Sequence, residues 1–140
     1  MILFMRVLAI DYGTVKTGLA VSDSLGKLAT PLCVLKIKSI KKLAEEIGQN
    51  ITKLKIDKVI IGCPKRTDGK ESDMQKKVEV FAELLFSKTG MRAELVNEIY
   101  TTVIAAQKLH ENDKNAKQQK DIIDSVAAAI LLQDFLDKNK

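Results

Sequence analysis

A chain of 140 residues has the length of one ordinary domain and can bury a substantial hydrophobic core. Hydrophobic residues make up 46% of the chain and charged residues 29%, a balance that is typical of globular proteins and excludes an intrinsically disordered one. The 23 basic and 18 acidic residues give a net charge of +5, which is compatible with a polyanionic partner but does not require one.

Cysteine and histidine content argues against several kinds of site. Cys33 and Cys63 each lie within an apolar run, so we expect reduced thiols in a protein core rather than a disulfide or a metal site. His110 is the only histidine, which argues against a histidine-rich zinc site and against a Ser-His-Asp triad. The apolar segment 1–5 is too short for a signal sequence or a membrane span, so the expected location is the cytoplasm.

The first third of the chain predicts three β-strands joined by short turns. Residues 4–10 form an apolar run, and further strands are expected at 17–22 and 28–36, with a glycine in each intervening turn. Pro31 has no backbone N–H to donate, so the third strand should lie at a sheet edge or carry a bulge. Consecutive hairpins predict an antiparallel meander.

Helical periodicity begins near residue 39. Apolar residues three and four positions apart predict an amphipathic helix with Ser39 as its N-cap, and they are Ile40, Leu43, Ile47, Ile51 and Leu54. Ser72 and Gln75 match a capping box that opens a second helix, and Gly90 stands where its C-cap is expected.

The remaining segments complete an α/β pattern. They are strands at 58–64 and 92–96, a helix from Thr101 or Thr102 to about His110, a polar stretch at 111–119 and a last helix over about 120–137. Because each of the two later strands is reached through a helix, both should join the sheet in parallel. The expected fold is therefore a mixed five-stranded sheet, three strands antiparallel and two parallel, flanked by helices.

Two acidic residues follow strands that should run parallel. Asp11 ends the first strand and Glu98 follows the last, so both carboxylates should emerge at the carboxyl edge of the sheet, where open α/β sheets build their sites. Gly13 permits a tight turn there and leaves room for a bulky ligand.

The last helix carries a third acid in an apolar context. Asp124 shares a helical face with Asp121 and precedes Ala127, Ala128 and Ala129, whose small side chains should let the helix lie close to the sheet. A carboxylate beside a buried stripe is costly unless a cation, a lysine or an N-cap role compensates it.

Each acid also has a structural interpretation. Asp11 can be a turn residue, Glu98 can cap the following helix, and Asp121 can be a first-turn acid favoured by the helix dipole. Taken together, Asp11, Glu98 and Asp124 suggest a carboxylate cluster, which suits Mg²⁺ or Mn²⁺ better than zinc. Such a cluster can hold two ions that activate water and stabilise the leaving oxygen of a phosphodiester.

Four segments together resemble the YqgF family over essentially the whole chain. They are "AIDYGTVKTGLAVSD", "VIIGCPKRTDGKES", "LVNEIYTT" and "IIDSVAAAILLQDFL". The family comprises RNase H-like proteins described as Holliday-junction-resolvase homologues and as pre-16S rRNA nucleases. The resemblance implies one RNase H-like nuclease domain over 1–140, with Asp11, Glu98 and Asp124 as metal ligands and catalytic residues.

The activity implied by this resemblance is metal-dependent endonucleolytic cleavage, with the 5′ end of pre-16S rRNA as substrate and Mg²⁺ or Mn²⁺ as cofactor. One motif departs from the family: the usual Asp-Glu-Arg is Asn97-Glu98-Ile99 here, which removes two charges and leaves reduced activity as an alternative. Basic residues that would contact flanking phosphates, or would simply be solvated loop charges, are Lys16, Lys65, Arg66 and Lys70.

Three functional interpretations compete. A nuclease would cleave structured RNA or branched DNA, with nucleic acid or a ribosomal particle as partner, acting as a monomer or weak homodimer. An ATPase interpretation rests on Asp-x-Gly-Thr at residue 11, but such enzymes need two lobes and this chain supplies one. A non-catalytic nucleic-acid-binding or ribosome-binding module would keep the fold without turnover.

Overall fold

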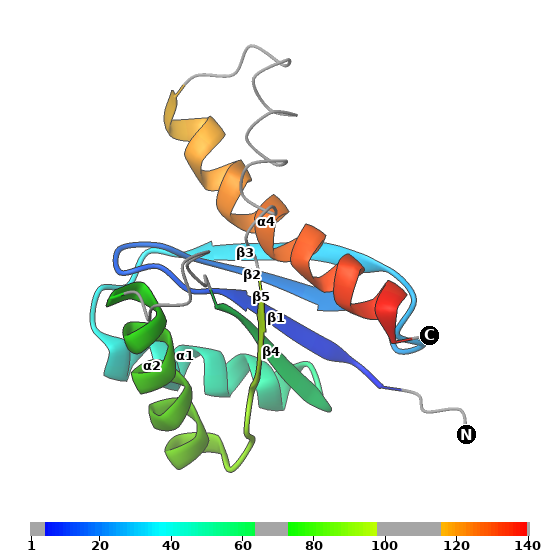
Figure 1. Cartoon of the computed structure of the whole chain (residues 1–140), viewed down its shortest axis with the longest axis horizontal. Coiled ribbons are helices and arrows are strands. Elements are labelled where there is room, and N and C mark those ends of the chain that lie inside the picture. The colour runs from blue at the N-terminus through cyan, green and yellow to red at the C-terminus, as the bar shows by residue number, and fades with distance from the viewer. Residues whose placement is uncertain (1–4, 64–72, 98–115, 140) are drawn as a thin grey trace.

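The computed structural model describes residues 5–63, 73–97 and 116–139, and it describes the side chains of the last range from residue 125 onward. A twisted five-stranded sheet forms the centre, with helices α1 and α2 on one face and helix α4 on the other (Figure 1). No helix in these ranges combines the length and the apolarity needed to cross a bilayer.

The sheet has the order β3-β2-β1-β4-β5. Its strands are β1 (Val7–Asp11), β2 (Thr17–Ser22), β3 (Ala29–Leu35), β4 (Lys58–Cys63) and β5 (Glu94–Asn97). The pairs β1–β2 and β2–β3 are antiparallel, whereas β1–β4 and β4–β5 are parallel. The predicted mixed sheet, with three antiparallel strands and two added in parallel, is confirmed.

Pro31 shapes the edge strand β3 in both of the ways that the sequence allows. β3 lies at the edge of the sheet, and its register with β2 shifts between the pairs Leu19–Cys33 and Ala20–Pro31. This shift leaves one extra residue in β3, a β-bulge. An edge strand with a bulge tolerates a residue that cannot donate a ladder hydrogen bond.

Helices α1 (Ile40–Lys53) and α2 (Asp73–Thr89) cover one face of the sheet. The Ser39 hydroxyl accepts a hydrogen bond from the Lys42 N–H at 3.3 Å, so the predicted N-cap of α1 is confirmed. Gly90 has φ +74° and donates its N–H to the Phe86 carbonyl at 2.8 Å, as expected for a helix C-cap. Ser72 lies outside the described residues.

Helix α4 (Ala116–Lys138) begins four residues before the predicted start at 120. The expectation that the whole polar stretch 111–119 precedes the helix is therefore wrong for residues 116–119. Ala, Lys and Gln fill these positions, and all three have high helix propensity, so polarity alone did not mark a loop. The expected helix ending near His110 lies outside the described residues.

The two faces of the sheet have separate cores. Leu8, Ile10, Val59 and Ile61 point toward α1 and α2, where they pack with Phe81 among others. The alternate residues point toward α4 and pack with its buried side chains; this set includes Val7, Ala9, Ala20, Ile60, Ala128, Leu132 and Leu136. The buried residues Ala127 and Ala128 confirm that small side chains let α4 lie close to the sheet.

A side-chain amide fixes the direction of α4. Gln133 accepts a hydrogen bond from the Ala29 N–H at 3.0 Å and donates one to the Lys27 carbonyl at 3.0 Å. Ala29 pairs with Ser22, whose hydroxyl accepts from the Val7 N–H at 2.7 Å. The C-terminal part of α4 therefore lies beside the start of β1, and its earlier turns lie toward the end of β1.

Candidate functional site

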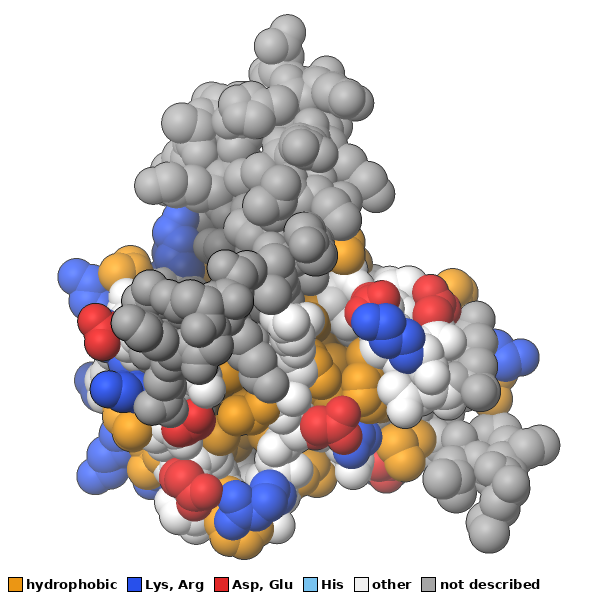
Figure 2. All heavy atoms as spheres, viewed as in Figure 1, with side chains coloured by type: hydrophobic (Ala, Val, Ile, Leu, Met, Phe, Trp, Pro, Cys, Tyr) orange, Lys and Arg blue, Asp and Glu red, His pale blue; other side chains and the backbone are white. Residues whose placement is uncertain are grey.

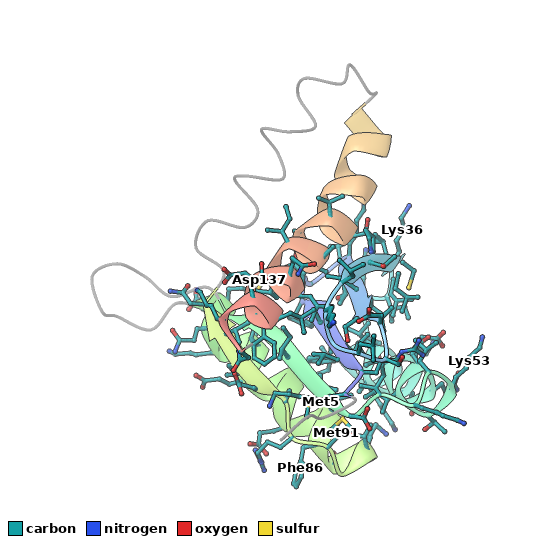
Figure 3. All side chains as sticks on the ribbon, turned by 90° about the vertical axis from the view of Figure 1, so that its right-hand side faces the viewer. Met5, Lys36, Lys53, Phe86, Met91 and Asp137 are labelled. Atoms are coloured by element: carbon teal, nitrogen blue, oxygen red, sulfur yellow. The ribbon has the colours of Figure 1, made fainter. Side chains whose placement is uncertain are left out.

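Asp11 is the last residue of β1, the central strand of the sheet. The parallel strands β1, β4 and β5 end at the same edge, where sites form in open α/β sheets. Figure 3 shows Met5 and Lys36 at opposite ends of the sheet, and Lys36 follows β3, which runs parallel to β1. Asp11 therefore lies at the end of the sheet marked by Lys36.

Strand alternation gives the direction of the Asp11 side chain. Ile10 and Tyr12 belong to the core under α1 and α2, whereas Val7 and Ala9 belong to the core under α4. Because successive side chains point to opposite faces of a strand, Asp11 faces the α4 side. Its side chain is half-buried there.

An aromatic pair anchors the chain immediately after Asp11. The rings of Tyr12 and Phe81 stack with centroids 4.9 Å apart and planes 21° from parallel. Burial raises the pKa of the Tyr12 phenol above its usual value, so this neighbour of Asp11 is uncharged at neutral pH. The stack thereby holds the backbone beside the carboxylate without adding a charge.

The turn after Tyr12 is closed by Gly13 and Thr17. The Gly13 N–H donates to the Thr17 hydroxyl oxygen at 3.4 Å, and that hydroxyl donates to the Gly13 carbonyl at 3.3 Å. A Cβ on residue 13 would collide with the Lys16 carbonyl oxygen, so the tight turn predicted at Gly13 requires glycine for space. Lys16 is half-buried in this turn, five positions after Asp11.

The other predicted site residues are described only in part. Asp124 belongs to the backbone of α4, but its side chain lies outside the described residues. Glu98 follows Asn97, the last residue of β5, and lies outside them too, as do Lys65, Arg66 and Lys70. Among the described side chains, no three of His, Cys, Asp and Glu come together as metal ligands. The structure therefore places Asp11 and Lys16 at this edge and leaves the convergence of the three acids a prediction.

The chemistry of this edge fits a hard divalent cation. Asp11 supplies carboxylate oxygens, the donors that Mg²⁺ and Mn²⁺ prefer. Cys63 also ends its strand here, but its thiol is buried in the opposite core and both cysteines are free thiols, as expected. Burial raises the pKa of the Cys33 thiol, with the negative charge of Glu46 adding to the effect.

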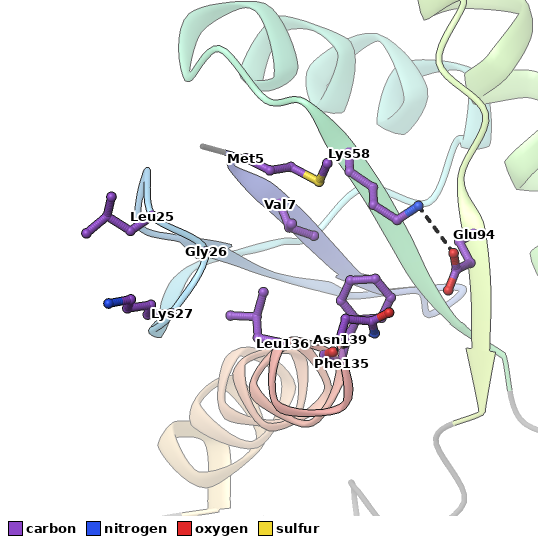
Figure 4. Close-up of a pocket in the computed structure, with 10 residues that line it drawn as sticks. All are labelled: Met5, Val7, Leu25, Gly26, Lys27, Lys58, Glu94, Phe135, Leu136 and Asn139. Carbon is purple, nitrogen blue, oxygen red and sulfur yellow. Dashed lines mark hydrogen bonds and ion pairs between the residues drawn. The ribbon is translucent and has the colours of Figure 1, made fainter. Parts of the chain in front are cut away.

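A pocket at the opposite edge of the sheet is a weaker candidate (Figure 4). Its one carboxylate, Glu94, pairs with Lys58 at 3.2 Å, and the Lys58 ammonium lies 5.9 Å from the centroid of the Phe135 ring. The pocket borders the start of β1 rather than its end, because Met5 and Val7 line it. Its acid is thus already neutralised and lies away from Asp11.

Sequence reasoning missed Thr17 and Gln133, two side chains that position the site. Thr17 closes the turn after Asp11, and Gln133 ties α4 to the β2–β3 turn. A buried threonine at the start of a strand was a usable signal for the first residue. Nothing near residue 133 in the sequence indicates contact with residues 27 and 29.

Basic side chains do not gather on the face shown in Figure 2. There, the described Lys and Arg side chains lie singly or beside acidic ones. Three printed ion pairs join lysine or arginine to glutamate across elements or turns, and they are Lys58–Glu94, Lys88–Glu45 and Arg92–Glu83. The net charge of +5 is thus not concentrated in one stripe of the described residues on this face.

Comparison with known proteins places the chain in a family. Residues 5–138 match the model of the RuvX family, described as Holliday junction resolvase. A protein of Fusobacterium nucleatum named "Putative pre-16S rRNA nuclease" is 39% identical, with 96% of this chain and 99% of that protein aligned. A protein of Clostridioides difficile with the same name is 35% identical, over 94% of each chain.

Solved structures agree on the fold. RuvC of T. thermophilus in complex with a Holliday junction substrate superimposes with a TM-score of 0.57 at 14% identity, covering 96% of this chain and 95% of that one. The Fowlpox virus resolvase with Holliday junction DNA gives a TM-score of 0.54 at 16% identity, covering 94% and 99%. The expected RNase H-like fold is confirmed.

Proposed function

The chain belongs to the RuvX family, and on this basis we propose that it is a metal-dependent endonuclease that hydrolyses phosphodiester bonds in nucleic acid. The observation that carries the proposal is the half-buried Asp11 carboxylate at the end of the central strand, where the parallel strands also end. We propose one nuclease domain over residues 1–140, acting in the cytoplasm.

Pre-16S rRNA, cleaved at its 5′ end, is the substrate that we propose. The two curated relatives compared above carry that substrate in their names and align over almost their full lengths. A ribosomal particle is then the expected partner, and a monomer or weak homodimer suffices because a single RNA strand is cut.

Asp11, Glu98 and Asp124 would hold the metal. Mg²⁺ or Mn²⁺ bound there supplies a Lewis acid that activates water and stabilises the leaving oxygen. Asp11 contributes from the centre of the sheet on the α4 face. Glu98 comes two positions after Val96, which also faces α4, and an extended chain would give both the same face.

Helical spacing supports the third ligand. Residue 124 precedes the buried Ala128 by four positions and Ala127 by three, so it falls on the stripe of α4 that faces the sheet. The earlier turns of α4 lie toward the end of β1, the strand that Asp11 completes. Lys16, Lys65, Arg66 and Lys70 would hold the flanking phosphates without reading sequence.

The test is cleavage of a pre-16S rRNA 5′-end substrate with Mn²⁺ or Mg²⁺ and with EDTA. Asp11→Asn keeps the size of the side chain and removes its charge, so we expect cleavage to fall at least 100-fold while the thermal unfolding midpoint without metal stays within a few degrees. Asp134→Asn is the matched control, because Asp134 is exposed on α4 and pairs only with Lys138 among the printed ion pairs. Normal cleavage by Asp11→Asn would exclude Asp11 from the mechanism.

A four-way DNA junction is the second candidate substrate. The family description and the fold shared with two resolvases favour it. Symmetric cleavage of two strands requires a dimer, so junction cleavage should rise with protein concentration through a dimerisation step. Binding of either nucleic acid without cleavage in any metal would instead support the non-catalytic module.

A further inference from the structure

The residues beside Asp11 across the sheet form an unusual row. Asp11 pairs with Gly18 on β2, and the β1–β4 register, which sets Ile10 opposite Ile61, continues to place Asp11 beside Gly62. Gly18 pairs with Val34 on β3, and Gly62 pairs with Val96 on β5. The row across all five strands is therefore Val34, Gly18, Asp11, Gly62 and Val96.

All five residues belong to the face of the sheet that α4 covers. Laterally paired residues share a face, and Val96 packs in the core under α4. The neighbours of this row along the strands, Ile10, Leu19 and Cys63, belong to the opposite core. The Asp11 carboxylate is thus the one side chain between two valines that lie two strands away on either side.

Two glycines in adjoining strand positions have a cost. Glycine weakens a strand interior because it loses more conformational entropy and offers no side chain to pack. Neither Gly18 nor Gly62 has the positive φ that would demand glycine, since the positive-φ glycines of the described residues are Gly26 and Gly90. Space beside Asp11 is the remaining physical reason for both.

The space has a direction on each side. Gly18 lies on β2, against which α4 packs, and α4 contains position 124. Gly62 lies on β4, between Asp11 and β5, and position 98 follows β5 directly. With strands about 4.8 Å apart, the two glycines lie about 10 Å from each other with Asp11 midway.

We propose that Gly18 and Gly62 are positioning residues that leave room for two further carboxylates to approach Asp11. Gly18 admits Asp124 from the side of α4, and Gly62 admits Glu98 from the side of β5. This inference rests on the proposed function. A methyl group at either position would stand between two carboxylates that must share an ion, and ligand distances near 2.0–2.1 Å for Mg²⁺ leave no tolerance for such a wedge.

The test uses Gly18→Ala and Gly62→Ala in the full chain, with Mn²⁺ affinity measured by calorimetry without substrate. We expect the dissociation constant for Mn²⁺ to rise at least tenfold in each variant. The unfolding midpoint in EDTA should stay equal or rise, because alanine loses less conformational entropy than glycine on folding. Val34→Ile is the matched control: it adds one carbon to the same row two strands from Asp11, and its Mn²⁺ affinity should stay within twofold of the wild type.

The possible outcomes are distinct. Wild-type Mn²⁺ affinity in both alanine variants would overturn the inference and leave the proposed function intact. A fall of more than about 10 °C in the metal-free midpoint of both variants would assign the glycines to the packing of α4 and overturn it too. A wild-type chain that binds no Mn²⁺ and cleaves no substrate would remove the proposed function, and this inference with it.

Discussion

Truncation of Phe81 to alanine should destabilise the protein strongly, because this ring supports the segment beside Asp11. Phe81 is completely buried and stacks on Tyr12 at 4.9 Å. Replacing a buried phenylalanine with alanine costs about 3–5 kcal/mol, of which the aromatic pair accounts for about 0.5–1.5 kcal/mol. An unfolding entropy of about 2.1 cal/mol/K per residue gives about 0.3 kcal/mol/K for this chain, so the unfolding midpoint should fall by about 10–15 °C.

Differential scanning calorimetry of Phe81→Ala beside Val80→Ala provides the measurement. Val80 is the preceding residue of α2 and is 56% exposed, so its truncation should cost under about 0.5 kcal/mol and under about 2 °C. Phe81→Leu separates the two contributions, since it keeps most of the buried volume and loses the ring stack. A midpoint for Phe81→Ala within about 3 °C of that for Val80→Ala would refute the assignment of this stack to the core.

Two further predictions concern α4 and the end of β5. Gln133→Ala removes the two hydrogen bonds that tie α4 to the β2–β3 turn, which should cost about 1–2 kcal/mol and lower the midpoint by about 3–7 °C, whereas Asp134→Ala should change it by less than 2 °C. Asn97→Asp restores the acid of the family motif but should leave the dissociation constant for Mn²⁺ within threefold of the wild type, and a tenfold gain in affinity would contradict the face assigned to residue 97.

The order and type of the described elements could be predicted from local patterns. Pro31 indicated an edge or bulged strand, Ser39 an N-cap and Gly90 a C-cap, and each of these depends on chemistry within a few residues of the signal. The start of α4 could not be predicted in this way. Its first turn is polar and lacks a stop signal, and polarity was mistaken for a loop.

The lateral neighbours of Asp11 could not be predicted from the sequence. Gly18 and Gly62 lie far apart in the chain and come to Asp11 through strand register. Register depends on how whole strands bury their apolar faces, and a shift of one residue would exchange the faces of every side chain. A sequence pattern therefore indicates that a strand ends in a carboxylate, but it does not indicate which residues surround that carboxylate.

Register also bears on the one motif that departs from the family. Val96 packs in the core under α4, so Asn97 projects from the other face, beside Cys63, whose thiol is buried in the core under α1 and α2. Asp11 faces α4. An acid at position 97 would thus lie across the sheet from Asp11, where it could share no ion with that carboxylate. Because the sheet separates the two faces, the asparagine at 97 removes charge from the far side and leaves the proposed ligand at 98 in place.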